Sequence, residues 1–234
     1  MQAPAPLVQP TAWLPSSAPL AAHLAAAVDW VDEQCFARGV HGVLVVPARG
    51  DERAHPELLA FARDHAVTTR RARRPPTGLA GLTGDAGHRP VLVHDPGPDD
   101  LAFALALAAG APVCLLDVAP LPPGAPAGWR RGWALAVGAR DLSRPLGRAR
   151  ALLDPRVRDV VTAALVVGAH GFVPAHERHR VQPLLREFAD LCAPGGPAPA
   201  PAGTSAAGLL LGAALAAGLD AAAARRLARW LPGR

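Results

Sequence analysis

Residues 89–117 read RPVLVHDPGPDDLAFALALAAGAPVCLLD, in which a strand, a helix and a second strand follow one another. The apolar run Arg89–His94 lies between a glycine and an Asp-Pro-Gly turn, which is the profile of a strand buried on both faces. Pro98 stands at a first helical position with two aspartates behind it, where carboxylates favour the positive end of the helix dipole. Gly110 ends that helix, and Val113–Leu116 is the next apolar run. The segment therefore predicts a βαβ unit with two parallel strands.

Three further short runs predict strands on either side of this unit. Two precede it and one follows it, at Val40–Val46, Val67–Ala72 and Arg140–Leu142. Segments with helical periodicity or helix-starting residues separate the strands, at 20–37, 55–65 and 129–137. Strands that alternate with helices indicate a parallel sheet with helices on its faces. We therefore expect an α/β fold, with a Rossmann-like or flavodoxin-like open, mainly parallel sheet of about four to five strands and a helical C-terminal module.

Changes in composition predict the domain organisation. Residues 1–19 hold several prolines and little periodicity, so we expect a flexible arm there. Residues 20–145 would form the Rossmann-like domain and residues 146–234 the helical module. Within that module, a Pro- and Ala-rich linker at 193–203 would lead to a final helix at about 206–230.

All 24 basic residues are arginine, and alanine and proline are abundant, which is typical of a high-GC bacterial composition. The arginine content is therefore weak support for phosphate binding, and the net charge of +5 permits a polyanionic partner without requiring one. The three cysteines, Cys35, Cys114 and Cys192, lie far apart in apolar contexts. That pattern predicts small buried side chains and neither a disulfide framework nor a metal site.

The N-terminal residues lack a basic region followed by an apolar core, so we expect no secretory signal. The longest apolar run, Ala206–Leu219, is interrupted by glycines and is shorter than the roughly 18–20 residues that a membrane span needs. We therefore expect a soluble cytoplasmic protein with no membrane partner.

Open parallel sheets bind ligands beyond the carboxyl ends of their strands, so the residues after each predicted strand are candidates for a binding site. The candidates are Arg49, Gly50, His94, Asp95, Gly97, Asp117, Arg140 and Asp141. His94, Asp95 and Asp117 are also the candidates for catalysis, because a histidine beside a carboxylate can move protons. An Asp-Pro-Gly sequence is equally what an ordinary turn requires.

No complete catalytic, metal or phosphate-binding motif is present. The Gly-rich segment 78–87 matches neither GxGxxG nor GxxxxGK[ST], and it precedes a strand instead of opening a helix. The polar residues His170, His176, Glu177 and His179 lack the HExxH spacing, so we predict a solvated helix face and no metal. The serines lie in no G-x-S-x-G elbow, and no cysteine has a recognisable base beside it.

Arg70, Arg71, Arg73 and Arg74 form a basic cluster suited to contact with nucleic acid or an acidic partner. The cluster contains no interleaved aromatic residues, and a charged loop at a sheet edge explains it equally well.

The passage DDLAFALALAAGAPVCLLD, residues 99–117, resembles the helix–strand passage of nucleoside-deoxyribosyltransferase-like and TIR-like Rossmannoid proteins. In those families an A-x-x-x-G-x-P-V run ends the helix and starts the next strand, and an acidic residue on the helix performs the glycosidic chemistry. The helix interior here, Phe103–Leu107, has no glutamate. The resemblance implies a related fold without that activity.

These observations favour a non-catalytic, regulatory or structural protein that binds a ligand or another protein. The Ala- and Leu-rich final helix suits packing against a protein partner or a second copy of the chain. The alternative is an enzyme that acts on a nucleotide or nucleoside at the strand ends. Nucleic-acid binding through Arg70–Arg74 is a weaker alternative.

Overall fold

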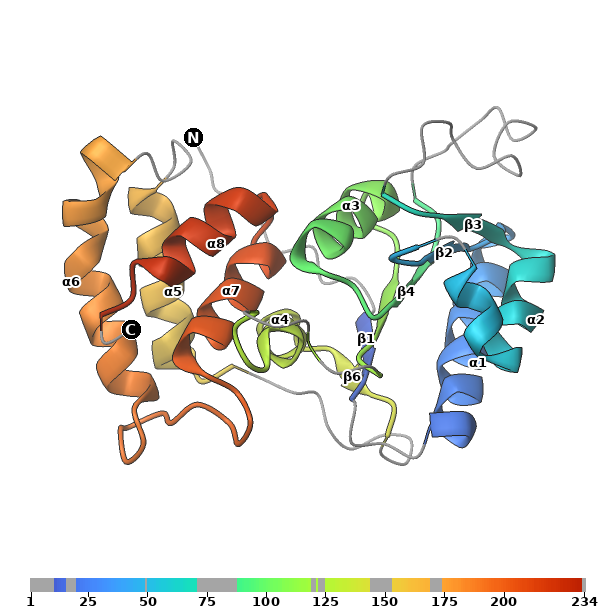
Figure 1. Cartoon of the computed structure of the whole chain (residues 1–234), viewed down its shortest axis with the longest axis horizontal. Helices are drawn as coiled ribbons and strands as arrows, with labels where there is room; N and C mark the ends of the chain where they lie inside the picture. Colours follow the sequence, from blue (N-terminus) through green and yellow to red (C-terminus); the bar gives the residue numbers. More distant parts are fainter. Residues whose placement is uncertain are drawn as a thin grey trace. The chain divides into compact units, whose positions relative to one another are not determined.

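The computed structural model describes residues 11–15, 20–48, 50–70, 88–118, 121, 125–143, 153–168 and 174–232. These residues form two compact units (Figure 1). The α/β unit comprises the described residues of 11–118 and 139–143. The helical unit comprises those of 121–138 and 153–232.

A single, all-parallel sheet is the centre of the α/β unit. Its six strands in the described part of the chain are β1 (Thr11–Leu14), β2 (Val43–Val45), β3 (Ala66–Thr68), β4 (Val91–His94), β5 (Val113–Leu116) and β6 (Arg140–Asp141). They lie in the order β3-β2-β4-β5-β1-β6, and every neighbouring pair is parallel. The predicted α/β class and open Rossmann-like sheet are therefore confirmed, with more strands than expected.

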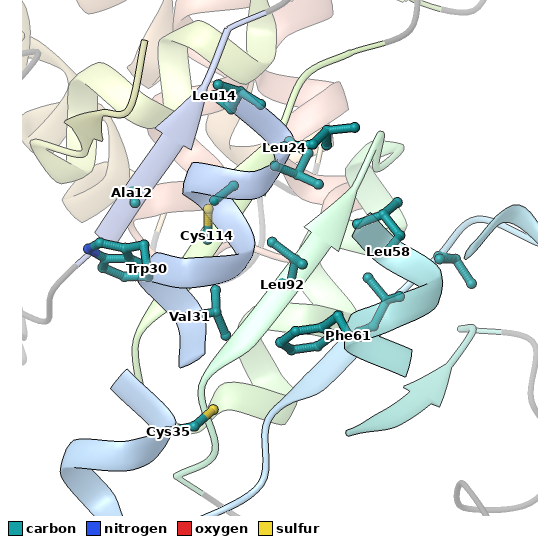
Figure 2. Packing of buried hydrophobic residues seen from close by; sticks show 14 residues of the cluster. Ala12, Leu14, Leu24, Trp30, Val31, Cys35, Leu58, Phe61, Leu92 and Cys114 are labelled. Atoms are coloured by element: carbon teal, nitrogen blue, oxygen red, sulfur yellow. The ribbon is translucent and has the colours of Figure 1, made fainter. Parts of the chain in front are cut away.

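Helices cover both faces of this sheet. They are α1 (Leu20–Arg38), α2 (Pro56–Asp64), which follows the short 3-10 helix η1 (Asp51–Ala54), and α3 (Pro98–Ala108). Side chains alternate along each strand, so one set faces α1 and α2, and Figure 2 shows it packed into a cluster around Leu92 of β4, Val31 of α1 and Phe61 of α2. Helix α3 lies on the other face, as a right-handed crossover from β4 to β5 requires (Figure 1).

Strand β1 was not predicted. Residues 1–19 were expected to form a flexible arm, but Thr11–Leu14 lie inside the sheet between β5 and β6, with Thr11 opposite Val113 and Ala12 opposite Arg140. The arm prediction is therefore wrong for these four residues. Burial explains the difference, because Ala12 and Leu14 join the cluster under α1 and Trp13 is buried as well.

The helical unit consists of α4 (Trp129–Val137), α5 (Pro155–Val167), α6 (Pro174–Cys192), α7 (Ala206–Ala216) and α8 (Ala221–Arg229). Helix α4 was expected to belong to the sheet domain, but it packs against α7 with their backbones in direct contact. A side chain on Gly212 of α7 would collide with the backbone oxygen of Trp129 and the backbone nitrogen of Trp133. The contact therefore depends on glycine and places 121–138 in the helical unit.

The C-terminal helix prediction also needs correction. The expected helix at 206–230 is two helices, since Gly218 adopts a left-handed backbone (φ 88°) and Asp220 caps α8 by accepting the Ala223 N–H at 2.8 Å. Residues 207–215 of α7 are all buried within the chain itself. The apolar surface that suggested a protein partner is therefore already covered.

The Pro- and Ala-rich segment 193–203 is packed rather than free. The Ala198 N–H donates to Leu191 O at 3.0 Å, and Arg156 Nη2 donates to Pro197 O at 2.6 Å. A side chain on Gly196 would lie 2.5 Å from Asp190 O. These contacts hold the segment against the end of α6, so the linker prediction does not describe its structure.

Among the residues that the structure describes, no helix is both long enough and apolar enough to cross a membrane.

Candidate functional site

The chain leaves β2 and β4 in opposite directions, which makes the boundary between these two neighbouring strands the topological switch point of the sheet. From β2 the chain continues through η1 and α2 to β3, and from β4 it continues through α3 to β5 on the other side. The order β3-β2-β4-β5 follows that of flavodoxin-like doubly wound sheets. In such sheets ligands bind outside the carboxyl ends of the strands at the switch point.

His94 and Asp95 form a histidine–carboxylate pair at this point. His94 is the last residue of β4 and is only 7% exposed, and its Nε2 lies 3.4 Å from Asp95 Oδ2. The ring of His55, which directly precedes α2, lies edge-on to the His94 ring with 5.6 Å between centroids. The structure thus brings a second histidine, from the loop after β2, to the predicted pair.

The backbone of Asp95 is held in an uncommon conformation. Its φ of 42° lies in the left-handed region, which a residue with a side chain adopts rarely. Two hydrogen bonds hold it there: its N–H donates to Leu116 O at 3.0 Å, and its Oδ1 accepts the Val118 N–H at 2.7 Å. Asp95 therefore joins the ends of β4 and β5 and orients the carboxylate beside His94.

The carboxylate of Asp100 lies at the N-terminus of its own helix, α3. Asp100 Oδ2 accepts the Gly97 N–H at 3.0 Å, and Asp100 Oδ1 lies 3.6 Å from Arg70 Nε. A helix N-terminus with free N–H groups would be a phosphate site. Here the Asp100 carboxylate lies at this terminus, where its negative charge disfavours a phosphate, and Arg70 already has an acidic neighbour.

Backbone N–H groups of the loop after β2 likewise donate to carboxylates of the same loop. The Ala48 N–H donates to Asp51 Oδ2, and the Gly50 N–H donates to Glu52 Oε2, both at 2.9 Å. Gly50 has a φ of 96°, which explains the glycine at this turn. Two more carboxylates therefore lie at the switch-point edge.

The predicted ligand-binding residues do not form one set. Asp117 follows β5, is half-buried, and donates its N–H to Leu14 O at 2.9 Å. Arg140 and Asp141 lie on β6, which β5 and β1 separate from β4. Three strand spacings amount to about 14 Å, so these two residues are far from His94. Asp141 instead accepts the N–H and the hydroxyl of Ser143 at 3.0 and 2.6 Å.

Several predicted residues lie outside the described part of the chain. These are Arg49 of the switch-point loop, Arg71, Arg73 and Arg74 of the basic cluster, the Gly-rich segment 78–87 and His170. Of the helix residues proposed as solvated, Glu177 is buried and His179 is exposed. Within the described ranges no group of three or more His, Cys, Asp or Glu side chains is arranged to hold a metal ion.

All three cysteines are buried and free of disulfides. Burial raises the pKa of Cys35 to about 12, with a further increase from Asp32 and an opposing effect of Arg38. Burial also raises the pKa of Cys114, and it raises the pKa of Cys192 to about 11 with help from Asp154. At neutral pH these thiols stay protonated, so they are poor nucleophiles.

His55 and the Arg70–Asp100 contact were missed in the sequence. His55 stands between η1 and Pro56, where it resembles an ordinary residue before a helix. Its position in the loop after a predicted strand was the available signal. Its contact with His94 could be recognised only once β2 and β4 were known to be neighbours in the sheet.

Comparison with known proteins finds no matching family, no similar curated protein and no similar solved structure.

Proposed function

We propose that the α/β unit is a ligand-binding module whose site lies at the switch point between β2 and β4. The observation that supports this most directly is the pair of His94 and Asp95, with Nε2 and Oδ2 3.4 Å apart and the His55 ring beside them. Polar side chains from both switch-point loops meet where doubly wound sheets bind their ligands. The role is recognition, in keeping with a regulatory or sensory protein.

The charges at this edge indicate the class of ligand. Carboxylates predominate in the described loops: Asp51, Glu52, Asp95, Asp99, Asp100 and Asp117 stand against Arg53 and Arg70. A phosphate would meet this negative charge, which includes the Asp100 carboxylate at the N-terminus of α3. The ligand is therefore a small molecule with hydroxyl or amino groups and no phosphate, such as a nucleoside.

Binding is favoured over catalysis by the way the backbone holds the carboxylate of the pair. His94 is buried, and the Asp95 carboxylate also accepts the Val118 N–H, which fits a role in orientation. A nucleoside-directed enzyme is the second candidate, because a histidine next to a carboxylate can act as a general acid or base. His94→Asn separates the two, since it preserves a polar side chain but cannot transfer a proton near neutral pH.

Native mass spectrometry of the full chain, purified gently from its own host, tests the proposal. We expect a nucleoside-sized mass without phosphate on the wild type, retention of that mass in His94→Asn, and its loss in His55→Ala. His41→Ala is the matched control, because His41 is an exposed histidine of the same unit at the other end of the sheet.

A wild-type protein without any bound mass, or with a phosphorylated one, contradicts the proposal. Turnover of a nucleoside by the wild type but not by His94→Asn would favour the enzyme.

A further inference from the structure

A buried arginine lies at the amino end of β4, at the end of the strand opposite His94. Arg89 is 5% exposed, and its Nε and Nη1 atoms are buried without a hydrogen-bond partner. It forms no ion pair with the carboxylates of the described residues. Arg156, although exposed, forms hydrogen bonds from Nε and Nη2 to Asp154.

Burial without a partner is unusual for a guanidinium. Arginine keeps its charge at any physiological pH, so it cannot escape the cost of burial by losing a proton. Buried charges in proteins are accordingly paired or held by several hydrogen bonds. The donors of Arg89 therefore require an acceptor that the described residues do not provide.

The backbone around Arg89 is fixed by three neighbouring elements. The His88 N–H donates to Ala108 O at the end of α3 at 3.2 Å, and the Val91 N–H donates to Pro112 O at 2.9 Å. Pro90 O accepts the Val43 N–H of β2 at 2.9 Å. The backbone on both sides of Arg89 is therefore fixed, and burial restricts its side chain, so the guanidinium would lose little conformational freedom on binding.

We infer that Arg89 is the anchor of a binding site for an oxyanion, the carboxylate or phosphate group of a small molecule, at the amino end of the sheet. Both groups accept hydrogen bonds from a guanidinium in its planar geometry. The site is separate from the switch-point site, since five residues of extended chain from Arg89 to His94 span about 16 Å. The two sites would also differ in the charge of their ligands, because Arg89 attracts an anion and the carboxylates of the switch-point edge disfavour one.

Titration of the full chain with inorganic phosphate tests this inference, with sodium chloride used to keep the ionic strength constant. We expect the melting temperature of the wild type to rise by about 3–5 °C at ten times the Kd. Arg89→Met should abolish that rise. Arg63→Met, which removes an exposed arginine of α2 in the same unit, should preserve it.

A parallel titration with acetate distinguishes the two ligand groups. A response to acetate but not to phosphate assigns the site to carboxylates, and the reverse assigns it to phosphates. Equal shifts in the wild type and in Arg89→Met mean an adventitious ion only and overturn the inference. The absence of any shift in the wild type with both anions also overturns it.

If Arg89→Met does not fold, Arg89→Lys provides the second variant, since it keeps the charge and removes the planar donors. Isothermal titration calorimetry with the anion that responds should then show at least tenfold weaker binding. An unchanged affinity contradicts the inference. None of these readouts involves His94, so the switch-point proposal stands or fails separately.

Discussion

Two histidine–aspartate pairs lie at opposite ends of the same sheet, and they differ in the distance between the imidazole and the carboxylate. At the amino end, His65 Nδ1 accepts the Gly42 N–H at 2.9 Å while its Nε2 lies 2.8 Å from Asp32 Oδ1. At the carboxyl end, His94 Nε2 lies 3.4 Å from Asp95 Oδ2. The same two residue types thus connect α1, α2 and β2 at one end and form a looser contact at the other.

The surroundings of the two pairs support this distinction. The His65 ring packs on Phe61, a member of the cluster in Figure 2, with 4.1 Å between the ring centroids. At the carboxyl end Asp95 has a left-handed backbone, with a φ of 42°, which its hydrogen bonds to Leu116 O and to the Val118 N–H hold in place. The geometry around a histidine, more than its presence beside an acid, separates a structural pair from a candidate site.

The largest expected effect on stability follows from the loss of the His65–Asp32 pair, which we call the structural pair. His65→Leu removes two hydrogen bonds and leaves the buried Gly42 N–H without its acceptor, while water can solvate the half-exposed Asp32 carboxylate, so we expect a loss of about 1–3 kcal/mol in the free energy of unfolding. Urea-induced unfolding measures it. His94→Leu should cost less than His65→Leu, because the 3.4 Å contact that it removes from Asp95 is weaker than the 2.8 Å contact that His65→Leu removes from Asp32. Equal losses in the two variants would contradict the distinction.

Glycines at the two ends provide a second comparison. A side chain on Gly42 would lie 2.9 Å from Cys35 Sγ and 3.1 Å from Phe61 Cζ, so Gly42→Ala should cost about 1–3 kcal/mol by overpacking. A side chain on Gly97 would meet only Asp100 Oδ2, at 3.1 Å. We therefore expect Gly97→Ala to lower the free energy of unfolding by less than about 1 kcal/mol. Thermal melts of both variants check this, and the reverse order would show that the carboxyl end is the tighter one.

Removing the cap of α3 should have a smaller effect on stability and a clear effect on ligand choice. Asp100→Ala takes away the acceptor of the Gly97 N–H, at a cost of about 1 kcal/mol. It also removes a negative charge where a phosphate would bind. We expect AMP to stabilise this variant more than it stabilises the wild type, as a thermal shift. Equal shifts would mean that Asp100 does not exclude phosphate.

The smallest effect concerns the thiols. Burial keeps the pKa of Cys35 near 12, above the value of about 8.5 in an unfolded chain, so the folded state favours the neutral thiol. The resulting stability is present below about pH 8.5 and is lost as the pH rises toward 12. Labelling of the folded chain with a thiol reagent at pH 8 should therefore be very slow. Rapid labelling of Cys35 would show that the amino end opens readily.

The sequence predicted local units better than their assembly. The segment 89–117 formed the expected strand, helix and strand, because its apolar runs, Pro98 and Gly110 are local signals. Strand β1 was missed because TAWL is only four residues long and its partners, β5 and β6, lie about a hundred residues or more away. The same insertion explains why Arg140 and Asp141 are far from His94.

The candidate site was predictable only in part. His94, Asp95 and Gly97 follow a strand that the sequence shows clearly, so they were found. His55 meets them only because β2 and β4 are neighbours, and strand order cannot be read from periodicity. In the helical unit, the apolar character of residues 207–215 correctly indicated that they are buried. It did not show that the element packed against them is α4 of the same chain.

Histidine ring resonances, followed by NMR during titration with adenosine, test the central claim most directly. The full chain contains both pairs, so His65 is an internal control for His94, and single variants assign the signals. We predict that the ring signals of His94 and His55 shift in a saturable way while those of His65 stay in place. Shifts of equal size at His65 and His94, or no shift at His94, would contradict a binding site at the switch point.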